Sequence, residues 1–210
     1  MAAERRNGFL TVVVVALVVV AAVAVGVVLR SRDPARGPQV LAVGDSVTYM
    51  SANPIKDAFD WTDNVDVQGR PGYRTDQLVP IALEFVDADD PEVLVVFTGY
   101  NDLTQGVDTS QAVEQMMDVA AAQPCAVWLL VPTKGDYAPA AAEAFNSRVV
   151  ALAEDRASVH LSTDWRDAVD ATDGPDPDPA LVSEDHIHPV ADGEVRLAQA
   201  MEEAASRECR

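Results

Sequence analysis

The sequence predicts an α/β fold with a five-stranded parallel sheet, because short apolar runs alternate with helical patterns along the chain. Val93–Phe97 is the clearest strand, an unbroken apolar run rich in β-branched residues, as in a strand buried on both faces. Asp108–Ala122 is a clear helix, since its apolar residues recur at helical spacing. Right-handed crossovers between successive strands then give a sheet covered by helices on both faces.

The other expected elements follow in order. The first strand, Val40–Val43, runs into Gly-Asp-Ser at residues 44–46, and an irregular stretch with one short helix around Ile55–Phe59 comes next. Val65–Val67 is a second short strand, and Thr75 is expected to cap the helix after it. Two further strands are predicted at Cys125–Val131 and Val159–Leu161, and two further helices at Ala138–Asp155 and Val190–Ser206.

An apolar segment from Gly8 to Leu29 precedes this domain and contains no charged residue. At about 1.5 Å rise per residue it spans roughly 33 Å as a helix, enough to cross a bilayer. Its length and the lack of a good small-residue cleavage site favour a retained anchor over a cleaved signal. We therefore expect a transmembrane anchor at residues 1–30, a linker at 31–39 and a folded domain at 40–210. Arginines on both sides of the span leave its orientation open.

The chain is strongly acidic. The formal net charge of the chain is −19, and five Arg against one Glu and one Asp give residues 1–36 a local sum of +3. The remaining residues therefore carry about −22. Such a surface repels phosphates, so no nucleic-acid partner is expected.

Four short blocks are expected to meet at one edge of the sheet. Ser46 follows the first strand, a glycine-rich loop at residues 68–75 follows the second, and Gly99–Asp102 follows the third. The carboxyl ends of parallel strands form a crevice where ligands bind. The fourth block, Asp185–His188, precedes the last helix, which must start at the same edge. Asp185 and His188 lie three residues apart and can point the same way. The Asp185 carboxylate can then orient the His188 imidazole, which activates the Ser46 hydroxyl.

The chain resembles the SGNH/GDSL hydrolase family in these four blocks, which cover most of Val40–Ser206: Gly44-Asp45-Ser46, Gly72, Gly99-Tyr100-Asn101-Asp102 and Asp185-His186-Ile187-His188. The resemblance implies a three-layer, flavodoxin-like α/β/α fold and a serine esterase with Ser46, His188 and Asp185 as its triad. It also implies that an oxyanion is bound by the backbone N–H groups of Ser46 and a loop glycine and by the Asn101 side chain. Val47 stands where the family has leucine, a change that affects packing and not chemistry.

Several assignments have competitors. Gly72 is favoured over Gly69 as the oxyanion glycine, because it lies nearer to Thr75 and the start of the next helix. His188 is favoured over the competing base His186 by its spacing from Asp185. Tyr73 and Tyr100 either line the acyl site or pack. Asp173, Asp176 and Asp178 are expected to form a solvated loop, and we expect no metal or cofactor.

Cys125 and Cys209 are both expected at the sheet edge opposite Ser46, so they either form a disulfide or remain as two free thiols. A disulfide would support an extracytoplasmic location. The sequence thus predicts a membrane-tethered, extracytoplasmic serine esterase acting on O-acyl or O-acetyl esters of carbohydrate or lipid, either in small molecules or in polysaccharides. Acyl transfer to an alcohol and a non-catalytic binding module on the same fold are the alternatives.

Overall fold

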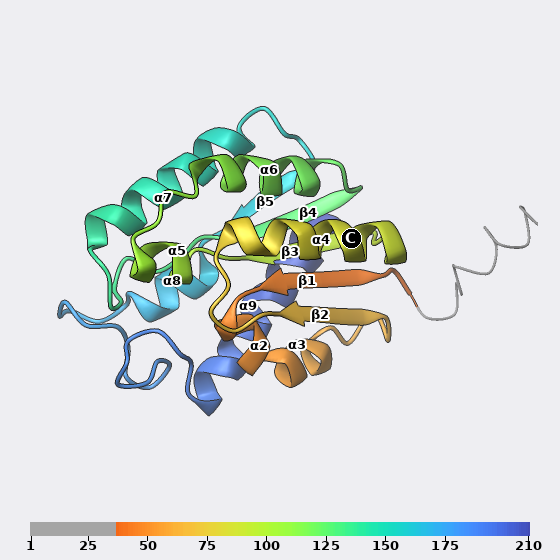
Figure 1. The fold of residues 1–210 in the computed structure, drawn as a ribbon. Coiled ribbons are helices and arrows are strands. Elements are labelled where there is room, and N and C mark those ends of the chain that lie inside the picture. The colour runs from red at the N-terminus through yellow and green to blue at the C-terminus, as the bar shows by residue number, and fades with distance from the viewer. Residues whose placement is uncertain (1–36) are drawn as a thin grey trace, which may run out of the picture. The chain divides into compact units, whose positions relative to one another are not determined.

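The computed structural model describes residues 37–210, which form a unit of their own with three layers, α/β/α (Figure 1). A five-stranded sheet lies in the middle in the order β2-β1-β3-β4-β5, and every neighbouring pair of strands is parallel. The predicted fold class is therefore confirmed. The strands are β1 (Val40–Gly44), β2 (Val65–Gly69), β3 (Val93–Phe97), β4 (Cys125–Leu129) and β5 (Val159–Ser162).

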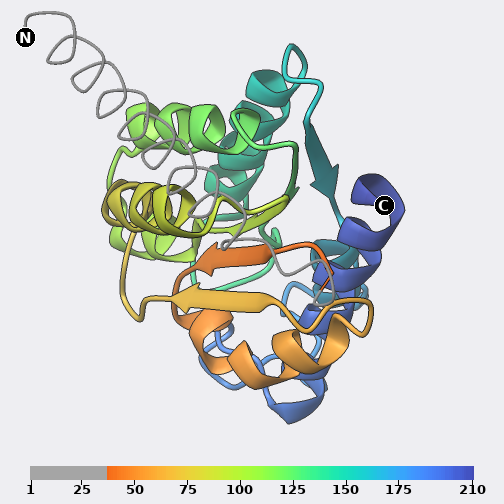
Figure 2. The ribbon, with the colours of Figure 1, turned by 90° about the vertical axis from the view of Figure 1, so that its right-hand side faces the viewer.

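The helices cover both faces of the sheet (Figure 2). Alternate residues of β1 point to opposite faces, as the pleat of a strand requires. Leu41 and Val43 pack with α4, α6 and α7, whereas Val40 and Ala42 pack with α3, α8 and α9. These six helices are α3 (Ala52–Ala58), α4 (Thr75–Asp89), α6 (Ser110–Ala121), α7 (Pro139–Ala153), α8 (Asp164–Val169) and α9 (Ala191–Cys209).

Three short helices were not predicted. The chain forms α2 (Ser46–Met50) directly after the Gly-Asp-Ser turn, and α5 (Tyr100–Gln105) lies where we expected only a loop. α8 is the third. Each has only five or six residues, too few for an apolar repeat to become visible in the sequence.

The cap predicted for α4 is also wrong. Arg74 occupies the N-cap position, and its N–H donates to Gln77 Oε1 at 3.1 Å. Thr75 is buried, and its hydroxyl lies 2.9 Å from the Thr98 hydroxyl. Its N–H donates to the buried carboxylate of Asp102, so the start of α4 is tied to α5. The sequence could not show this, because the partner comes from another part of the chain.

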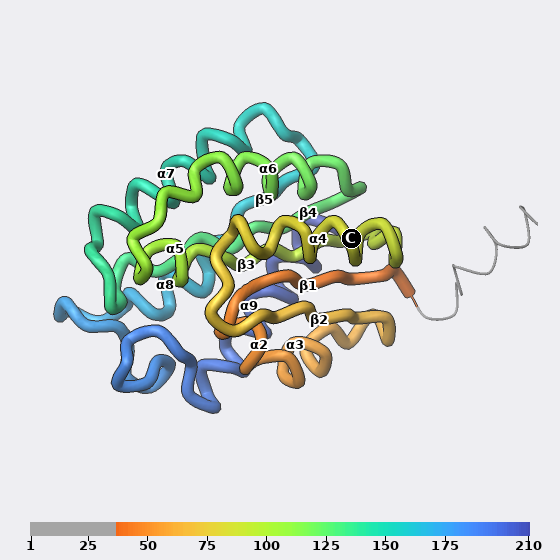
Figure 3. The backbone as a smooth tube through the Cα atoms, viewed as in Figure 1, coloured from red at the N-terminus to blue at the C-terminus, as the bar shows by residue number. Residues whose placement is uncertain are grey.

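The loops after the first three strands meet at the carboxyl edge of the sheet, as expected. The chain passes from β1 into α2 there (Figure 3), and the N–H of Arg70 donates to the carbonyl of Gly44 at 2.9 Å. The segment between α8 and α9 lies at the same end, toward which the arrowheads of β1 and β2 point (Figure 1). This edge therefore gathers all four blocks of the sequence.

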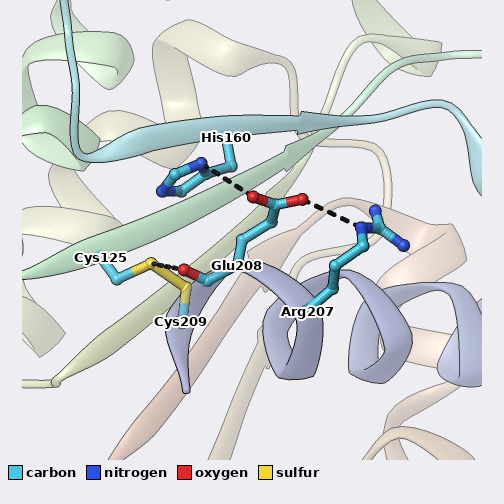
Figure 4. Close-up of a disulfide and its surroundings, with 5 residues drawn as sticks. All are labelled: Cys125, His160, Arg207, Glu208 and Cys209. Carbon is cyan, nitrogen blue, oxygen red and sulfur yellow. Dashed lines mark hydrogen bonds and ion pairs between the residues drawn. A yellow bond between two sulfur atoms is a disulfide. The ribbon is translucent and has the colours of Figure 1, made fainter.

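At the opposite edge, Cys125 at the start of β4 and Cys209 at the end of α9 form a disulfide (Figure 4). This decides between the two states that the sequence left open. Beside the bridge, Glu208 contacts His160 Nδ1 at 3.3 Å and Arg207 Nε at 2.9 Å. The end of α9 is thus fastened to β4 by the disulfide and contacts β5 through Glu208 and His160.

The predicted anchor at residues 1–30 lies outside the described residues. Among residues 37–210, none of the helices has the length and apolar character needed to span a membrane.

Candidate active site

Ser46 stands at the point where β1 gives way to α2. Asp45 is the N-cap of this helix, and its Oδ1 accepts the N–H of Val47 at 3.0 Å. Gly44 is needed here for space, because a Cβ at this position would lie 2.0 Å from Thr48 Oγ1. The close packing of the strand end against α2 fixes the direction in which Ser46 leaves the sheet.

The structure brings Ser46, His188 and Asp185 together. His188 Nε2 lies 2.9 Å from Ser46 Oγ, and His188 Nδ1 lies 2.6 Å from Asp185 Oδ2. A carboxylate can only accept, so Nδ1 carries the proton and Nε2 is left as the acceptor that faces the serine hydroxyl. This arrangement can remove a proton from Ser46.

Asp185 is held by three further hydrogen bonds in its own loop. Its Oδ1 accepts the hydroxyl of Ser183 at 2.8 Å and the N–H groups of Ile187 and His188 at 3.0 and 2.9 Å. Burial raises the pKa of Asp185, but the hydrogen bonds from the His188 ring and from these three donors outweigh it and hold the pKa well below its usual range. The carboxylate is therefore charged and able to stabilise an imidazolium.

Sequence reasoning missed Ser183. Its hydroxyl donates to Asp185, and its N–H donates to the carbonyl of His188 at 2.8 Å. The available signal was its place two residues before an aspartate in a turn, where such side chains often bond locally. That signal is too common to single out one serine.

His186, the competing base, occupies a different place. Its backbone has a φ of +59°, and its N–H donates to the carbonyl of Ser183 at 2.9 Å. The histidine that contacts Ser46 is His188. The left-handed backbone turns the two histidines of this block apart.

The two loop glycines serve different purposes. Gly69 ends β2, and a Cβ there would lie 2.3 Å from the backbone nitrogen of Tyr49, so packing requires glycine. Gly72 is exposed, has open space around its Cβ position and adopts a φ of +78°, so its conformation favours glycine. Within residues 37–210, the N–H groups of Gly72 and Ser46 donate to no protein acceptor. Both are therefore available to a substrate oxygen.

Asn101 lies beside the Gly72 loop. Its Nδ2 donates to the carbonyl of Tyr73 at 3.1 Å, and Gln105, one turn later on α5, donates to the carbonyl of Gly72 at 3.2 Å. An amide nitrogen carries two hydrogens, so the Asn101 side chain retains one N–H for another acceptor. The unpredicted helix α5 thus ties Asn101 to the loop glycine.

Tyr100, Tyr73 and Asp178, which the sequence also singled out, are packed, exposed or bonded within their own loop. Tyr100 is buried and its hydroxyl accepts the indole N–H of Trp165 at 3.1 Å, so it packs, whereas Tyr73 is 36% exposed. Asp178 Oδ1 accepts the N–H of Ala180 at 2.9 Å. In the part of the chain that the structure describes, no group of three or more His, Cys, Asp or Glu residues could hold a metal ion.

The sequence matches a known protein family. The model of the GDSL-like lipase/acylhydrolase family matches residues 42–196, which include all four blocks. The chain belongs to this family. It is therefore an enzyme of the ester hydrolase class.

Solved structures show the same fold. A GDSL-like lipase from Bacteroides thetaiotaomicron is 18% identical, with a TM-score of 0.67, over 81% of this chain and 88% of that one. A lipase/acylhydrolase from Enterococcus faecalis is 13% identical, with a TM-score of 0.68, over 82% and 97%. An acetyl xylan esterase from Geobacillus stearothermophilus is 17% identical, with a TM-score of 0.62, over 83% and 95%. No curated protein sequence matches this chain.

In this GDSL-family hydrolase, Asp45 has an unusual environment. The side chain is fully buried next to Ser46, and its Oδ2 has no hydrogen-bond partner among residues 37–210. Burial raises the pKa of Asp45 to about 7, helped by nearby Asp102 and opposed by the N–H of Val47 and by His188. A carboxyl whose pKa is higher in the folded than in the unfolded chain destabilises the fold as it ionises.

As pH rises from about 4 to about 7, ionisation of Asp45 should lower the free energy of unfolding of the wild type. Asp45→Asn should not show this decrease, because Asn does not ionise. Asn keeps an oxygen for the N–H of Val47. Between pH 4.5 and 8, the free energy of unfolding of the variant should improve relative to the wild type by on the order of 3 kcal/mol. Urea unfolding at the two pH values measures this. Asp57→Asn, at an exposed position of α3, controls for the loss of one negative charge, and an equal gain in that control would contradict the assignment.

Proposed function

We propose that this protein hydrolyses carboxylic esters through a Ser46–His188–Asp185 triad and an acyl-enzyme. The observation that carries the proposal is the pair of hydrogen bonds that links Ser46 Oγ to His188 Nε2 at 2.9 Å and His188 Nδ1 to Asp185 at 2.6 Å. Ser46 Oγ attacks the ester carbonyl while Nε2 takes its proton, and Nε2 then gives this proton to the leaving alcohol. A water molecule, deprotonated by the same nitrogen, releases the acid and restores Ser46.

The negative charge on the carbonyl oxygen needs donors that are already in position. We assign this role to the N–H groups of Ser46 and Gly72, which have no protein acceptor within residues 37–210, and to the amide of Asn101. Fixed donors of this kind stabilise the tetrahedral intermediate without reorganisation. Ser46 is then both the attacking group and one of the donors.

Asn101→Ala should lower kcat by about 10²- to 10³-fold and change KM little, because the donor acts mainly in the transition state. Steady-state hydrolysis of a short-chain ester measures both constants. Gln105→Ala removes the bond to the Gly72 carbonyl and the bond that Gln105 Oε1 accepts from Arg74 at 2.8 Å, but it keeps Asn101, so it should have a smaller effect on kcat. A rise in KM at constant kcat in Asn101→Ala would assign Asn101 to ground-state binding instead.

The substrates we propose are O-acyl or O-acetyl esters of carbohydrate or lipid, in small molecules or in polysaccharides. The likeness in fold to an acetyl xylan esterase supports the acetylated-carbohydrate part of this range. The acidic surface, about −22 beyond residue 36, opposes strongly anionic substrates.

A hydrolysis panel tests the proposal. Esters of one alcohol with acyl chains of increasing length are compared in the wild type and in Ser46→Ala, and a fluorophosphonate probe reports covalent labelling of the serine. We expect turnover and labelling in the wild type alone. Absence of both in the folded wild type would overturn the proposal. If an added alcohol diverts most of the acyl group into a new ester, acyl transfer replaces hydrolysis as the reaction.

We further propose that the catalytic domain is extracytoplasmic and tethered through residues 8–29. The Cys125–Cys209 disulfide supports the first part, since disulfides persist in oxidising compartments. The uncharged apolar segment of the sequence supports the second. Protease treatment of intact cells should release the domain from the membrane fraction. Protection of the domain until the cells are lysed would place it inside.

A further inference from the structure

The backbone around Gly72 forms a tight turn with an unbonded middle. The N–H of Tyr73 donates to the carbonyl of Arg70 at 3.2 Å, Pro71 is the second residue of the turn, and Gly72 is the third, with a φ of +78°. These are the features of a type II β-turn. Within residues 37–210, the central peptide between Pro71 and Gly72 makes no hydrogen bond to protein.

The direction of the Gly72 N–H depends on the type of this turn. In a type I turn the central peptide is rotated by roughly 160° relative to a type II turn. Under the proposed mechanism, such a rotation would turn the Gly72 N–H away from the substrate oxygen and bring the Pro71 carbonyl into its place. Glycine adopts both signs of φ readily, so Gly72 alone does not exclude this rotation. An oxyanion donor at this position therefore needs support from outside the turn.

Helix α5 supplies this support on the C-terminal side of Gly72. Two of its side chains, one helical turn apart, donate to successive carbonyls. Gln105 Nε2 donates to the carbonyl of Gly72 at 3.2 Å, and Asn101 Nδ2 donates to the carbonyl of Tyr73 at 3.1 Å. The backbone that follows the Gly72 N–H is thus tied to the helix at two points.

Arg74 determines which way the Gln105 amide faces. Gln105 Oε1 accepts from Arg74 Nη1 at 2.8 Å, and a guanidinium has no acceptor, so the amide oxygen faces Arg74 and the amide nitrogen faces the Gly72 carbonyl. Arg74 is itself held by Asp76, whose two oxygens accept from Nε at 3.0 Å and from Nη2 at 2.9 Å. A two-point bond of this kind fixes the plane of the guanidinium. Three side chains in series therefore lead from the start of α4 to the Gly72 carbonyl.

We propose that Gln105, oriented by Arg74, is a positioning residue for the oxyanion donor Gly72. It holds the turn in its type II form, so that the Gly72 N–H faces the substrate oxygen before the substrate binds. The inference rests on the proposed ester hydrolysis. Without Gln105 the turn exchanges between its two forms, and only the type II fraction stabilises the tetrahedral intermediate. The signature is a loss of kcat without a loss of substrate affinity.

Two variants of similar size separate positioning from stability. Gln105→Met removes both bonds of the amide. Gln105→Glu keeps an acceptor for Arg74 and adds an ion pair, but an ionised carboxylate cannot donate to the Gly72 carbonyl. Both should lower kcat by about five- to tenfold with little change in KM, a smaller loss than that of Asn101→Ala. Urea unfolding should show that Gln105→Glu is at least as stable as the wild type, so a loss of stability cannot explain its slower turnover.

A trifluoromethyl ketone gives a second readout of the same donors. Ser46 Oγ adds to its carbonyl carbon, and the carbonyl oxygen then lies in the oxyanion site as it does in the transition state. Its Ki should rise in both Gln105 variants by the factor by which kcat/KM falls. Gln77→Ala is the matched control, because Gln77 accepts the N–H of Arg74 at 3.1 Å and does not contact Gly72. It should leave kcat and Ki within about twofold of the wild type.

The outcomes that contradict the inference are specific. Unchanged kcat and Ki in both Gln105 variants would overturn it. An equal loss in Gln77→Ala would also overturn it, because the stability of the loop and not the bond to the Gly72 carbonyl would then explain the effect. Failure of the wild type to hydrolyse any ester would overturn the proposed function, and the inference with it, so the two failures are distinguishable.

Discussion

Ser46→Ala should lower kcat for ester hydrolysis by about four to six orders of magnitude. The substitution removes the only atom of this side chain that can attack the carbonyl, the Oγ that lies 2.9 Å from His188 Nε2. The side chain is half-buried and Asp45 still caps α2 by accepting the N–H of Val47, so the fold should persist. Steady-state turnover of a short-chain acetate, with circular dichroism and urea unfolding as controls, measures the two effects separately.

His188→Ala should lose nearly as much activity, and the double variant with Ser46→Ala should lose no more than either single variant. Residues that act as one unit are strongly non-additive, because either deletion already removes the nucleophilic step. His160→Ala is the matched control, since His160 contacts Glu208 at the opposite edge of the sheet. If the two losses multiply in the double variant, Ser46 and His188 act independently and the triad assignment is wrong.

The strands β1, β3 and β4 could be predicted because each is an apolar run of four or five residues, as expected of a strand covered on both faces. Val93–Phe97 must be buried on both faces, and its burial is complete in the structure. Parallel strands place their carboxyl ends together, so the meeting of Ser46 and His188, 142 residues apart, followed from topology. The wrong details are those that depend on a tertiary partner.

Two local features, the N-cap of α4 and the helix α5, could not be predicted from the sequence. Thr75 has the residue type of a helix cap, but burial against Thr98 and the carboxylate of Asp102 gives the N-cap position to Arg74. α5 is too short to be predicted from an apolar repeat in the sequence, although it carries Asn101 and holds the Gly72 loop. Local preferences in both cases yield to contacts that only the assembled fold supplies.

Removing the disulfide should have the largest effect on stability. Cys125 and Cys209 are separated by 84 positions, so their bridge restricts a long loop in the unfolded chain. Loop entropy assigns about 4–5 kcal/mol to a closure of this length. The double variant Cys125→Ser, Cys209→Ser should therefore unfold at a much lower urea concentration, and its m-value should rise because the unfolded chain expands. A midpoint that does not move would show that the bridge contributes little.

The same variant separates stability from catalysis. α9 begins two residues after Pro189, so its N-terminal end lies close to His188 in the chain. The disulfide holds only its C-terminal end. Between them, Leu197, Ala198 and Met201 are buried against the sheet and hold the helix without the bridge. In buffer without denaturant, we therefore expect kcat of the double variant to stay within about twofold of the wild type, since no transition-state contact is lost. A large fall in kcat while the protein is still folded would mean that the bridge also positions His188 through the length of α9.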